Sequence, residues 1–177
     1  MTLDELLNDN SKKIKEKTET ISNWLLDGSL PMEELIAFAE IAKDTAKATC
    51  IEAIEYATQK TPAISDENVL SFATQSLTNK APRVKWESAK VIGNIAPLFP
   101  TKLDLTLSNL ILNANDKGTV VRWATAYALG EILKLKTKHH NELLNTLEAL
   151  CDTEDNTGVK KKYLEALKVV RKKQSAT

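Results

Sequence analysis

Residues 84–95 read VKWESAKVIGNI, and residues 121–132 read VRWATAYALGEI. The two stretches align without gaps at an offset of 37, from position 84 to position 121. A weaker copy begins 38 positions earlier, at Ala46, and another begins 38 positions later, at Val159. A repeat of about 37 to 38 residues indicates a stack of similar units, and four copies exceed the roughly three that such a stack needs.

Each copy has the apolar spacing of a helix. In the first, Val84, Val91 and Ile92 fall on one stripe, which we expect to face the partner helix of the same repeat. Ala89 and Gly93 lie beside the stripe. Because small side chains let two helices approach closely, we interpret Gly93 as a packing residue and not as part of a phosphate-binding loop.

Signals for helix starts and ends continue along the whole chain. Thr2 and Glu5 form a capping box, Asn10 or Ser11 can cap a second helix, and Pro82 stands where another helix should begin. No sustained alternation of apolar and polar residues suggests strands. We therefore predict an all-α solenoid, an α-α superhelix of about nine helices in antiparallel pairs, without a sheet.

Composition agrees with a packed helical protein. Apolar residues make up 42% of the 177 residues and charged residues 27%. Cys50 and Cys151 stand apart in apolar helical stretches, so we expect two free, buried thiols too distant to bridge. The beginning of the chain lacks a signal-peptide pattern, and no apolar run reaches membrane-spanning length, so we expect a cytoplasmic protein without membrane association.

Charge is unevenly distributed although the formal net charge is zero. Residues 1–60 hold 7 basic and 12 acidic side chains, a balance of −5, which leaves +5 for residues 61–177. Most of the basic excess lies in residues 160–173. We interpret this lysine-rich stretch as a solvated terminal cap, because the last repeat of a solenoid needs a polar outer face.

Residues 121–132 carry a resemblance to the HEAT repeat family, whose second helix typically has a Val-Arg-x-x-Ala-x-x-Ala-Leu-Gly-x-Ile type of pattern. The resemblance covers residues 29–173 and is strongest over 82–133. It implies four HEAT-like helix pairs over 29–173, preceded by N-terminal capping helices at 1–28 and followed by a disordered tail at 174–177. It also implies a right-handed superhelix with the first helices of the pairs on the convex side and the second helices on the concave side.

The family also tends to place an acid six positions before its Arg, as Asp116 stands before Arg122. The resemblance therefore implies a structural pair between Arg122 and the preceding turn. Asn79 stands before Lys85 instead of an acid, and Ile41 stands before Lys47. We thus expect an incomplete ladder of such pairs along the stack.

Motifs for catalysis are missing from the sequence. There is no G-x-S-x-G, P-loop, GxGxxG or H-E-x-x-H pattern. His139 and His140 are adjacent, and neighbouring helical residues point about 100° apart, so they cannot share a metal by themselves. We therefore predict a non-enzymatic protein without a cofactor or a metal site.

The leading functional hypothesis is a scaffold or adaptor that binds another protein or a peptide through its concave surface. Trp86 and Trp123 occupy the same repeat position, off the apolar stripe, and we expect their indoles to lie side by side in the groove. Alternatively, both indoles cover the seams between repeats. The candidate binding residues combine this aromatic pair with the positions one and two turns further on: Trp86, Lys90, Asn94, Trp123, Tyr127 and Glu131.

The alternative hypothesis is nucleic-acid binding. The chain is similar in fold type to the alkylpurine DNA glycosylases built from HEAT-like repeats, which would imply an aromatic, basic groove. Lys85, Lys90, Lys161 and Lys162 would then contact phosphates. The chain departs from that class because no Asp lies one turn after Trp86, and because it is not basic overall. The sequence leaves the partner, the pathway and the oligomeric state open.

Overall fold

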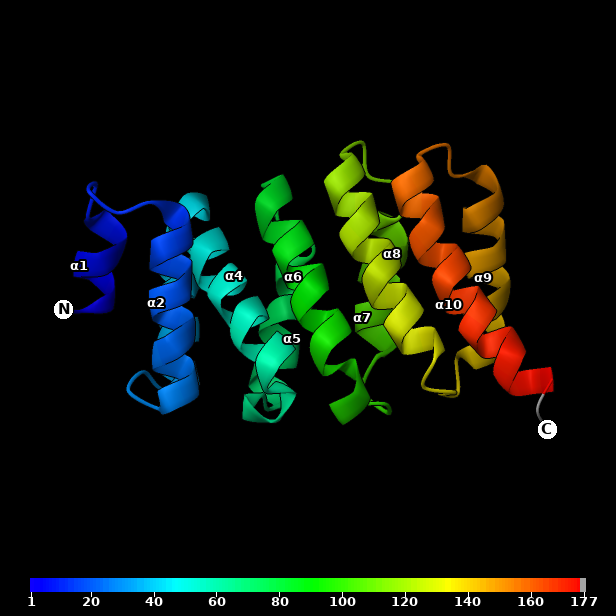
Figure 1. The fold of residues 1–177 in the computed structure, drawn as a ribbon, viewed down its shortest axis with the longest axis horizontal. Coiled ribbons are helices and arrows are strands. Elements are labelled where there is room, and N and C mark those ends of the chain that lie inside the picture. The colour runs from blue at the N-terminus through cyan, green and yellow to red at the C-terminus, as the bar shows by residue number, and fades with distance from the viewer. Residues whose placement is uncertain (176–177) are drawn as a thin grey trace.

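The computed structural model describes residues 1–175, which form ten α-helices and two short 3-10 helices, where the sequence predicted about nine helices (Figure 1). No strand occurs within these residues, so the predicted all-α fold is confirmed. The helices are α1 (Leu3–Asn8), α2 (Ile14–Asp27), α3 (Met32–Ile41), α4 (Asp44–Lys60), α5 (Glu67–Ser76), α6 (Pro82–Ile95), α7 (Asp104–Asn113), α8 (Thr119–Leu133), α9 (His140–Thr153) and α10 (Thr157–Ser175), with η1 (Pro62–Ile64) and η2 (Ala96–Leu98).

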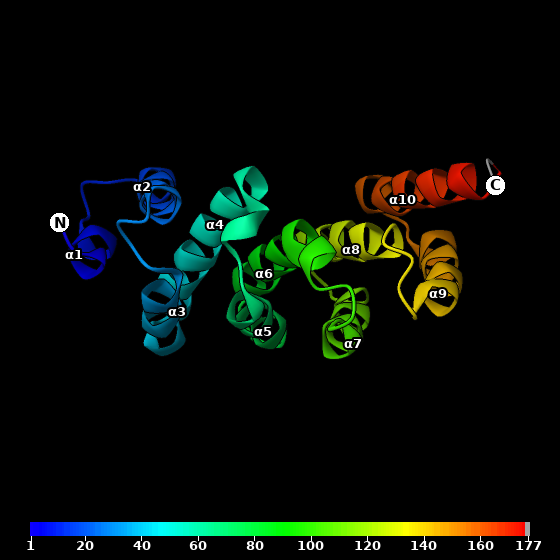
Figure 2. The same cartoon turned by 90° about the horizontal axis from the view of Figure 1, so that it is seen from below.

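The helices stack in two rows along the long axis of the molecule. Figure 2 shows α2, α4, α6, α8 and α10 in one row, which bows so that its open side is concave. Helices α3, α5, α7 and α9 form the other, convex row. The second helix of each pair therefore lines the concave side, as the sequence predicted.

Helix starts follow local hydrogen bonding. At α1 the predicted capping box is present, because the Glu5 N–H donates to Thr2 Oγ1 (3.2 Å) and the Thr2 N–H donates to Glu5 Oε2 (2.8 Å). Helix α2 begins later than expected, after Lys13. Ser11 does not cap it, because the helix begins three residues later, and both the N–H and the hydroxyl of Ser11 donate to Asp9. The Lys13 N–H instead donates to the carboxylate of Glu16.

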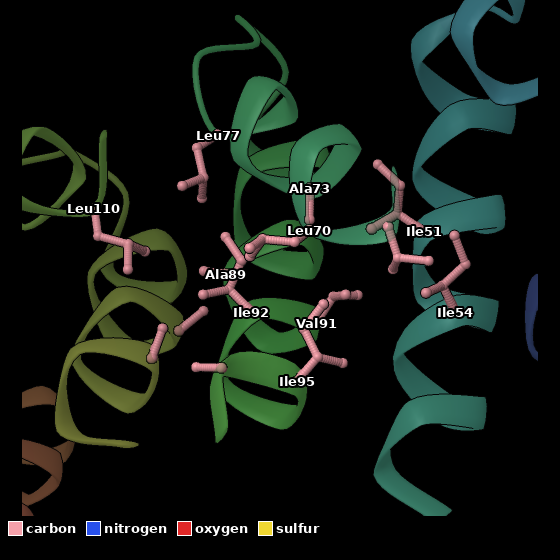
Figure 3. Close-up of a cluster of buried hydrophobic side chains, with 14 of the residues drawn as sticks. Ile51, Ile54, Leu70, Ala73, Leu77, Ala89, Val91, Ile92, Ile95 and Leu110 are labelled. Carbon is pink, nitrogen blue, oxygen red and sulfur yellow. The ribbon is translucent and has the colours of Figure 1, made fainter. Parts of the chain in front are cut away.

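The core runs through the stack as one buried cluster from Leu3 to Val170. Figure 3 shows its central part, where Leu70 of α5 lies between Ile51 of α4 and Ile92 of α6. Each repeat thus buries its apolar stripe against its own partner and its neighbours. A linear stack of repeats is stabilised in this way, by contacts within each repeat and between neighbouring repeats.

Two glycines permit close helix packing along the concave row. A Cβ built at Gly93 would lie 2.3 Å from Cε1 of Tyr127, so the Tyr127 ring occupies the space of the missing side chain. A Cβ at Gly130 would lie 2.9 Å from the Cβ of Ala166 in α10. The predicted packing role of these glycines is confirmed, although at Gly93 the close neighbour is an aromatic ring.

The turn before each of the last three second helices is built alike. Asn79, Asp116 and Glu154 each accept the main-chain N–H two residues further on, at 2.7, 2.8 and 2.9 Å. Because these side chains satisfy the same N–H, they set the direction in which the following helix begins. The acids among them are also positioned to meet a base from the preceding repeat.

Ion pairs join successive repeats at these turns. Lys85 pairs with Asp116 (2.8 Å), and one repeat later Arg122 pairs with Glu154 (2.9 Å). Arg122 also donates to the main-chain oxygen of Asp116 (3.0 Å), so it contacts the preceding turn as expected, through the main chain and not through the Asp116 carboxylate. Lys85 and the N–H of Gly118 already occupy that carboxylate.

The ladder is incomplete at the first of these turns, as predicted. Asn79 cannot form an ion pair, and its amide donates to Asp44 at 3.2 Å. Lys47, which precedes Lys85 by one repeat, instead lies 5.4 Å from the ring centroid of Phe72. The seam between α4 and α6 therefore depends on other contacts.

Cys50 and Cys151 are free and buried, which confirms that prediction. Helix α10 continues through Ser175, past residue 174 where a tail was expected to begin, and residues 176–177 lie outside the described part. None of the helices within residues 1–175 has the length and apolar character that crossing a membrane requires.

Candidate binding face

The seam between α4 and α6 buries charge on the concave side. Glu55 and Glu87 are only 3% and 4% exposed, and both accept from Nζ of Lys90, at 3.2 and 3.1 Å. Burial raises the pKa of Glu87. Burial also acts to lower the pKa of Lys90, but the two carboxylates outweigh it and leave that pKa raised. Lys90 is thus a structural counter-ion.

A second ion pair lies beside this cluster. Arg83 of α6 reaches the carboxylate of Glu52 on α4 at 2.5 Å, and the hydroxyl of Thr18 on α2 donates to the same carboxylate at 2.9 Å. Three consecutive concave helices therefore meet at Glu52. With Glu55 and Glu87, the centre of the concave side holds three carboxylates against the two bases Arg83 and Lys90.

Trp86 is half-buried, and its indole N–H donates to Oε1 of Glu87 at 2.7 Å. The Glu87 carboxylate thus accepts from both the indole and Lys90. Trp86 therefore combines a partly open ring with a hydrogen bond into the buried cluster.

Asn94 and Tyr127 connect three repeats. The Tyr127 hydroxyl donates to Oδ1 of Asn94 at 2.8 Å. The Asn94 amide donates in turn to the main-chain oxygen of Glu55 (3.2 Å) and to the hydroxyl of Thr58 (3.1 Å). Burial raises the pKa of Tyr127 to about 12, so the phenol remains a donor at physiological pH. These polar atoms are occupied within the protein.

Trp123 is the open aromatic residue on this side, with 36% of the residue exposed. Its ring stacks on Tyr127 at a centroid distance of 6.4 Å and an interplanar angle of 20°. Nζ of Lys162 lies 5.2 Å from the ring centroid, within the range of a cation–π contact. Tyr127, on which Trp123 stacks within α8, also fills the space at Gly93 of α6.

Lys162 of α10 lies at the Trp123 ring and is paired with Glu165 of the same helix. Lys162 pairs with Glu165 at 3.0 Å, and Glu131 pairs with Lys134 at 2.5 Å. The hydrogen bond from Lys162 lowers the pKa of Glu165, with further contributions from the charges of Lys161 and Lys134. We call this set the Trp123 corner: Trp123, Lys161, Lys162 and Glu165.

All six predicted residues lie on α6 and α8, in the concave row, but they differ in what they offer a partner. Lys90, Asn94 and Tyr127 hold neighbouring helices together, whereas Trp123 is open to solvent. Lys162 was predicted only as a phosphate contact and not as a neighbour of Trp123, and Glu165 was not predicted as part of the site. The repeat offset of 38 places Lys161 at the position equivalent to Trp123. This register could have indicated that this part of the last helix lies beside Trp123.

The proposed phosphate contacts are partly occupied as well. Lys85 pairs with Asp116, Lys90 with the buried carboxylates, and Lys162 with Glu165, whereas Lys161 is exposed. Within residues 1–175, no group of three or more His, Cys, Asp and Glu side chains is arranged to hold a metal ion.

These features define a class: a helical repeat solenoid of the armadillo or HEAT-like kind, with an open aromatic and charged concave side. No family model and no curated protein matches the sequence. Among solved structures, the chain is similar to a designed armadillo repeat protein (21% identity, TM-score 0.68), covering 94% of this chain and 79% of that one.

Two further solved structures are similar. One is a designed armadillo repeat protein in complex with the peptide (KR)4, at 23% identity and a TM-score of 0.66, covering 93% of this chain and 80% of that one. The other is from the complex of CpcE and CpcF of phycocyanin lyase from Nostoc sp. PCC7120, at 18% identity and a TM-score of 0.68, covering 93% and 96%. At these identities the likeness shows the fold alone.

Proposed function

We propose that this chain is a non-enzymatic, HEAT-like repeat scaffold that binds another protein or a peptide through its concave surface. The observation that carries the proposal is Trp123, a large aromatic residue left 36% exposed in the concave row while its neighbour Tyr127 is fixed beneath it. Rigid aromatic residues of this kind anchor binding partners at low entropic cost. One similar solved structure, a designed armadillo repeat protein, holds a peptide.

The proposal includes the absence of a catalytic step and a cytoplasmic location. Two groups that could act as a nucleophile or a base are buried or engaged. Burial raises the pKa of the Cys50 thiol to about 12, which leaves it protonated and unreactive. His139 pairs with Asp104 at 2.6 Å between α7 and α9, away from the concave row.

Capture from native lysate tests the proposal. Immobilised protein should retain a partner, and Trp123→Ala should weaken retention about tenfold or more, as truncation of an aromatic anchor does. Leu112→Ala is the matched control, because it removes an exposed apolar side chain from α7 in the convex row. Equal retention by both variants and the parent would refute the role of the concave surface.

Nucleic-acid binding is the second candidate, favoured by the lysines of α10 beside an exposed indole. A strand lying along the groove would also cross the α4–α6 seam, where Glu52, Glu55 and Glu87 outnumber their bases. Retention on a DNA column over a salt series decides the matter, because each phosphate contact contributes to a steep loss of affinity with salt.

A further inference from the structure

Charge changes sign along the concave side. The α4–α6 seam holds three carboxylates and two bases, so it is acidic by one charge. The Trp123 corner holds Lys161 and Lys162 against the single carboxylate Glu165, which leaves one positive charge in excess. A ligand lying across α8 and α10 therefore meets an excess of lysine, whereas a ligand over α4 and α6 meets an excess of carboxylate.

The lysines of the corner are close to the exposed ring. Lys162 lies 5.2 Å from the Trp123 centroid while it donates to Glu165, so one ammonium group already binds both a carboxylate and an aromatic face. Lys161 is exposed one residue before it and stands at the repeat position of Trp123. Glu165 is itself about half exposed, with 47% of its side chain open, so an incoming carboxylate can compete with it for Lys162.

We propose that the Trp123 corner binds a short acidic peptide segment, with an apolar or aromatic side chain on the Trp123 ring and flanking carboxylates on Lys161 and Lys162. This inference rests on the proposed function and specifies its partner. The intramolecular contacts of Lys162 show the two interactions such a peptide would make. Glu165 supplies the carboxylate contact within the protein, and the peptide replaces it.

An acidic peptide fits the face better than a nucleic-acid strand. The basic surface is confined to one end of the concave row, because Lys85 and Lys90 are bound to Asp116, Glu55 and Glu87. Two or three carboxylates near one apolar side chain match an area of that size. A polyphosphate chain needs a continuous basic track, and it would meet the buried carboxylates of the α4–α6 seam.

The test is fluorescence anisotropy with three labelled probes and the full chain. The first probe is an acidic peptide, Gly-Glu-Asp-Leu-Trp-Asp-Glu-Gly, the second is the (KR)4 peptide, and the third is an oligo-dT strand. We expect the acidic peptide to bind at least about tenfold more tightly than (KR)4, and to lose affinity as salt rises, since the charges involved are exposed. Tighter binding of (KR)4 or of oligo-dT overturns the inference.

Three variants locate the site. Trp123→Ala should weaken the acidic peptide about tenfold, and Lys162→Ala about threefold, the scale of one exposed charge pair. Glu165→Gln should strengthen binding about twofold, because it frees Lys162, and a merely structural role for Glu165 would not produce a gain. Lys102→Ala is the control, since Lys102 is also paired, with Glu67 of α5, but lies in the turn before α7 and outside the concave row.

The outcomes separate this inference from the proposed function. The acidic-peptide assignment is overturned if partner capture depends on Trp123 but the acidic peptide does not bind. It is also overturned if the peptide binds and neither Lys162→Ala nor Glu165→Gln changes its affinity. Both results leave the scaffold proposal intact. Loss of Trp123-dependent capture overturns the scaffold proposal itself. A circular dichroism spectrum and a melting curve for each variant show that the comparison is made between folded proteins.

Discussion

Gly93→Ala places a methyl group where the Tyr127 ring lies. The new Cβ would be 2.3, 2.7 and 2.9 Å from three ring carbons, whereas carbon atoms make favourable contacts at about 3.5 to 4.0 Å. The ring must therefore retreat by about 1 Å or more. It is held by its hydroxyl on Asn94 and by its stack on Trp123, so the retreat breaks contacts on both sides.

The free energy of unfolding of Gly93→Ala follows from two opposing terms. Replacing a helical glycine by alanine contributes about 1 kcal/mol of stability through helix propensity. Overpacking costs about 1 to 3 kcal/mol, and loss of the Tyr127–Asn94 hydrogen bond costs about 1 kcal/mol more. We expect a net destabilisation of about 1 to 3 kcal/mol, or a melting temperature lower by about 2 to 4 °C per kcal/mol for a chain of this size.

A double-mutant cycle isolates the contact. In a Tyr127→Ala background the ring is gone, so Gly93→Ala should become neutral or stabilising by up to about 1 kcal/mol. Urea unfolding followed by circular dichroism measures all four proteins, with equal slopes required for comparison. A stabilising Gly93→Ala in the parent protein, or the same effect in both backgrounds, would refute the assignment of Gly93 as the space that Tyr127 fills.

Three further predictions concern charge and thiols. Glu154→Gln should lower the free energy of unfolding by about 1 kcal/mol at neutral pH, because the hydrogen bond from Arg122 lowers the pKa of Glu154 in the folded protein. The parent's extra stability is present above the unfolded pKa, near 4.3, and is lost as pH falls through the lower folded pKa. The urea unfolding curves of the two proteins should therefore converge in acid. Lys90→Met leaves two buried carboxylates unpaired and should cost about 2 to 3 kcal/mol in urea unfolding at pH 7, and less at pH 5; an unchanged midpoint would contradict the counter-ion role. Cys50 and Cys151 should resist a thiol reagent in the native protein and give two free thiols after denaturation, and fewer than two would disprove the free state.

The fold could be predicted from the sequence because each repeat carries its own signals. The offset of 37 between two copies predicts a stack, and local caps such as the Thr2–Glu5 box identify helix starts without tertiary information. Ser11 is not the cap because α2 begins only after Lys13, and Ser11 instead donates its N–H and its hydroxyl to Asp9 in the preceding turn. The start of the helix depends on the shape of this loop, which residue type alone does not specify.

The binding face was less predictable because it depends on side-chain directions across a seam. Trp86 and Trp123 occupy equivalent positions in successive repeats, yet their neighbours differ. Tyr127 stacks on Trp123, whereas Glu87 accepts a hydrogen bond from the indole of Trp86. The repeat register placed Lys90 in the predicted site. In the structure Lys90 is instead the counter-ion of Glu55, which is buried on a different helix. Spacing shows which residues share a face, and only packing shows which of their polar atoms remain available.

Three of the four seams in the concave row use different kinds of contact, which limits how far the repeats of this protein are interchangeable. The α4–α6 seam uses buried ions, the α6–α8 seam an aromatic ring against Gly93, and the α8–α10 seam Gly130 against Ala166. Removing one repeat, residues 82–118, would bring Tyr127 to the place of Lys90 and strand Glu55 without a base. Each interface is specific to the two repeats that form it. Inserting, deleting or exchanging a single repeat would therefore require new side chains on both repeats that flank it.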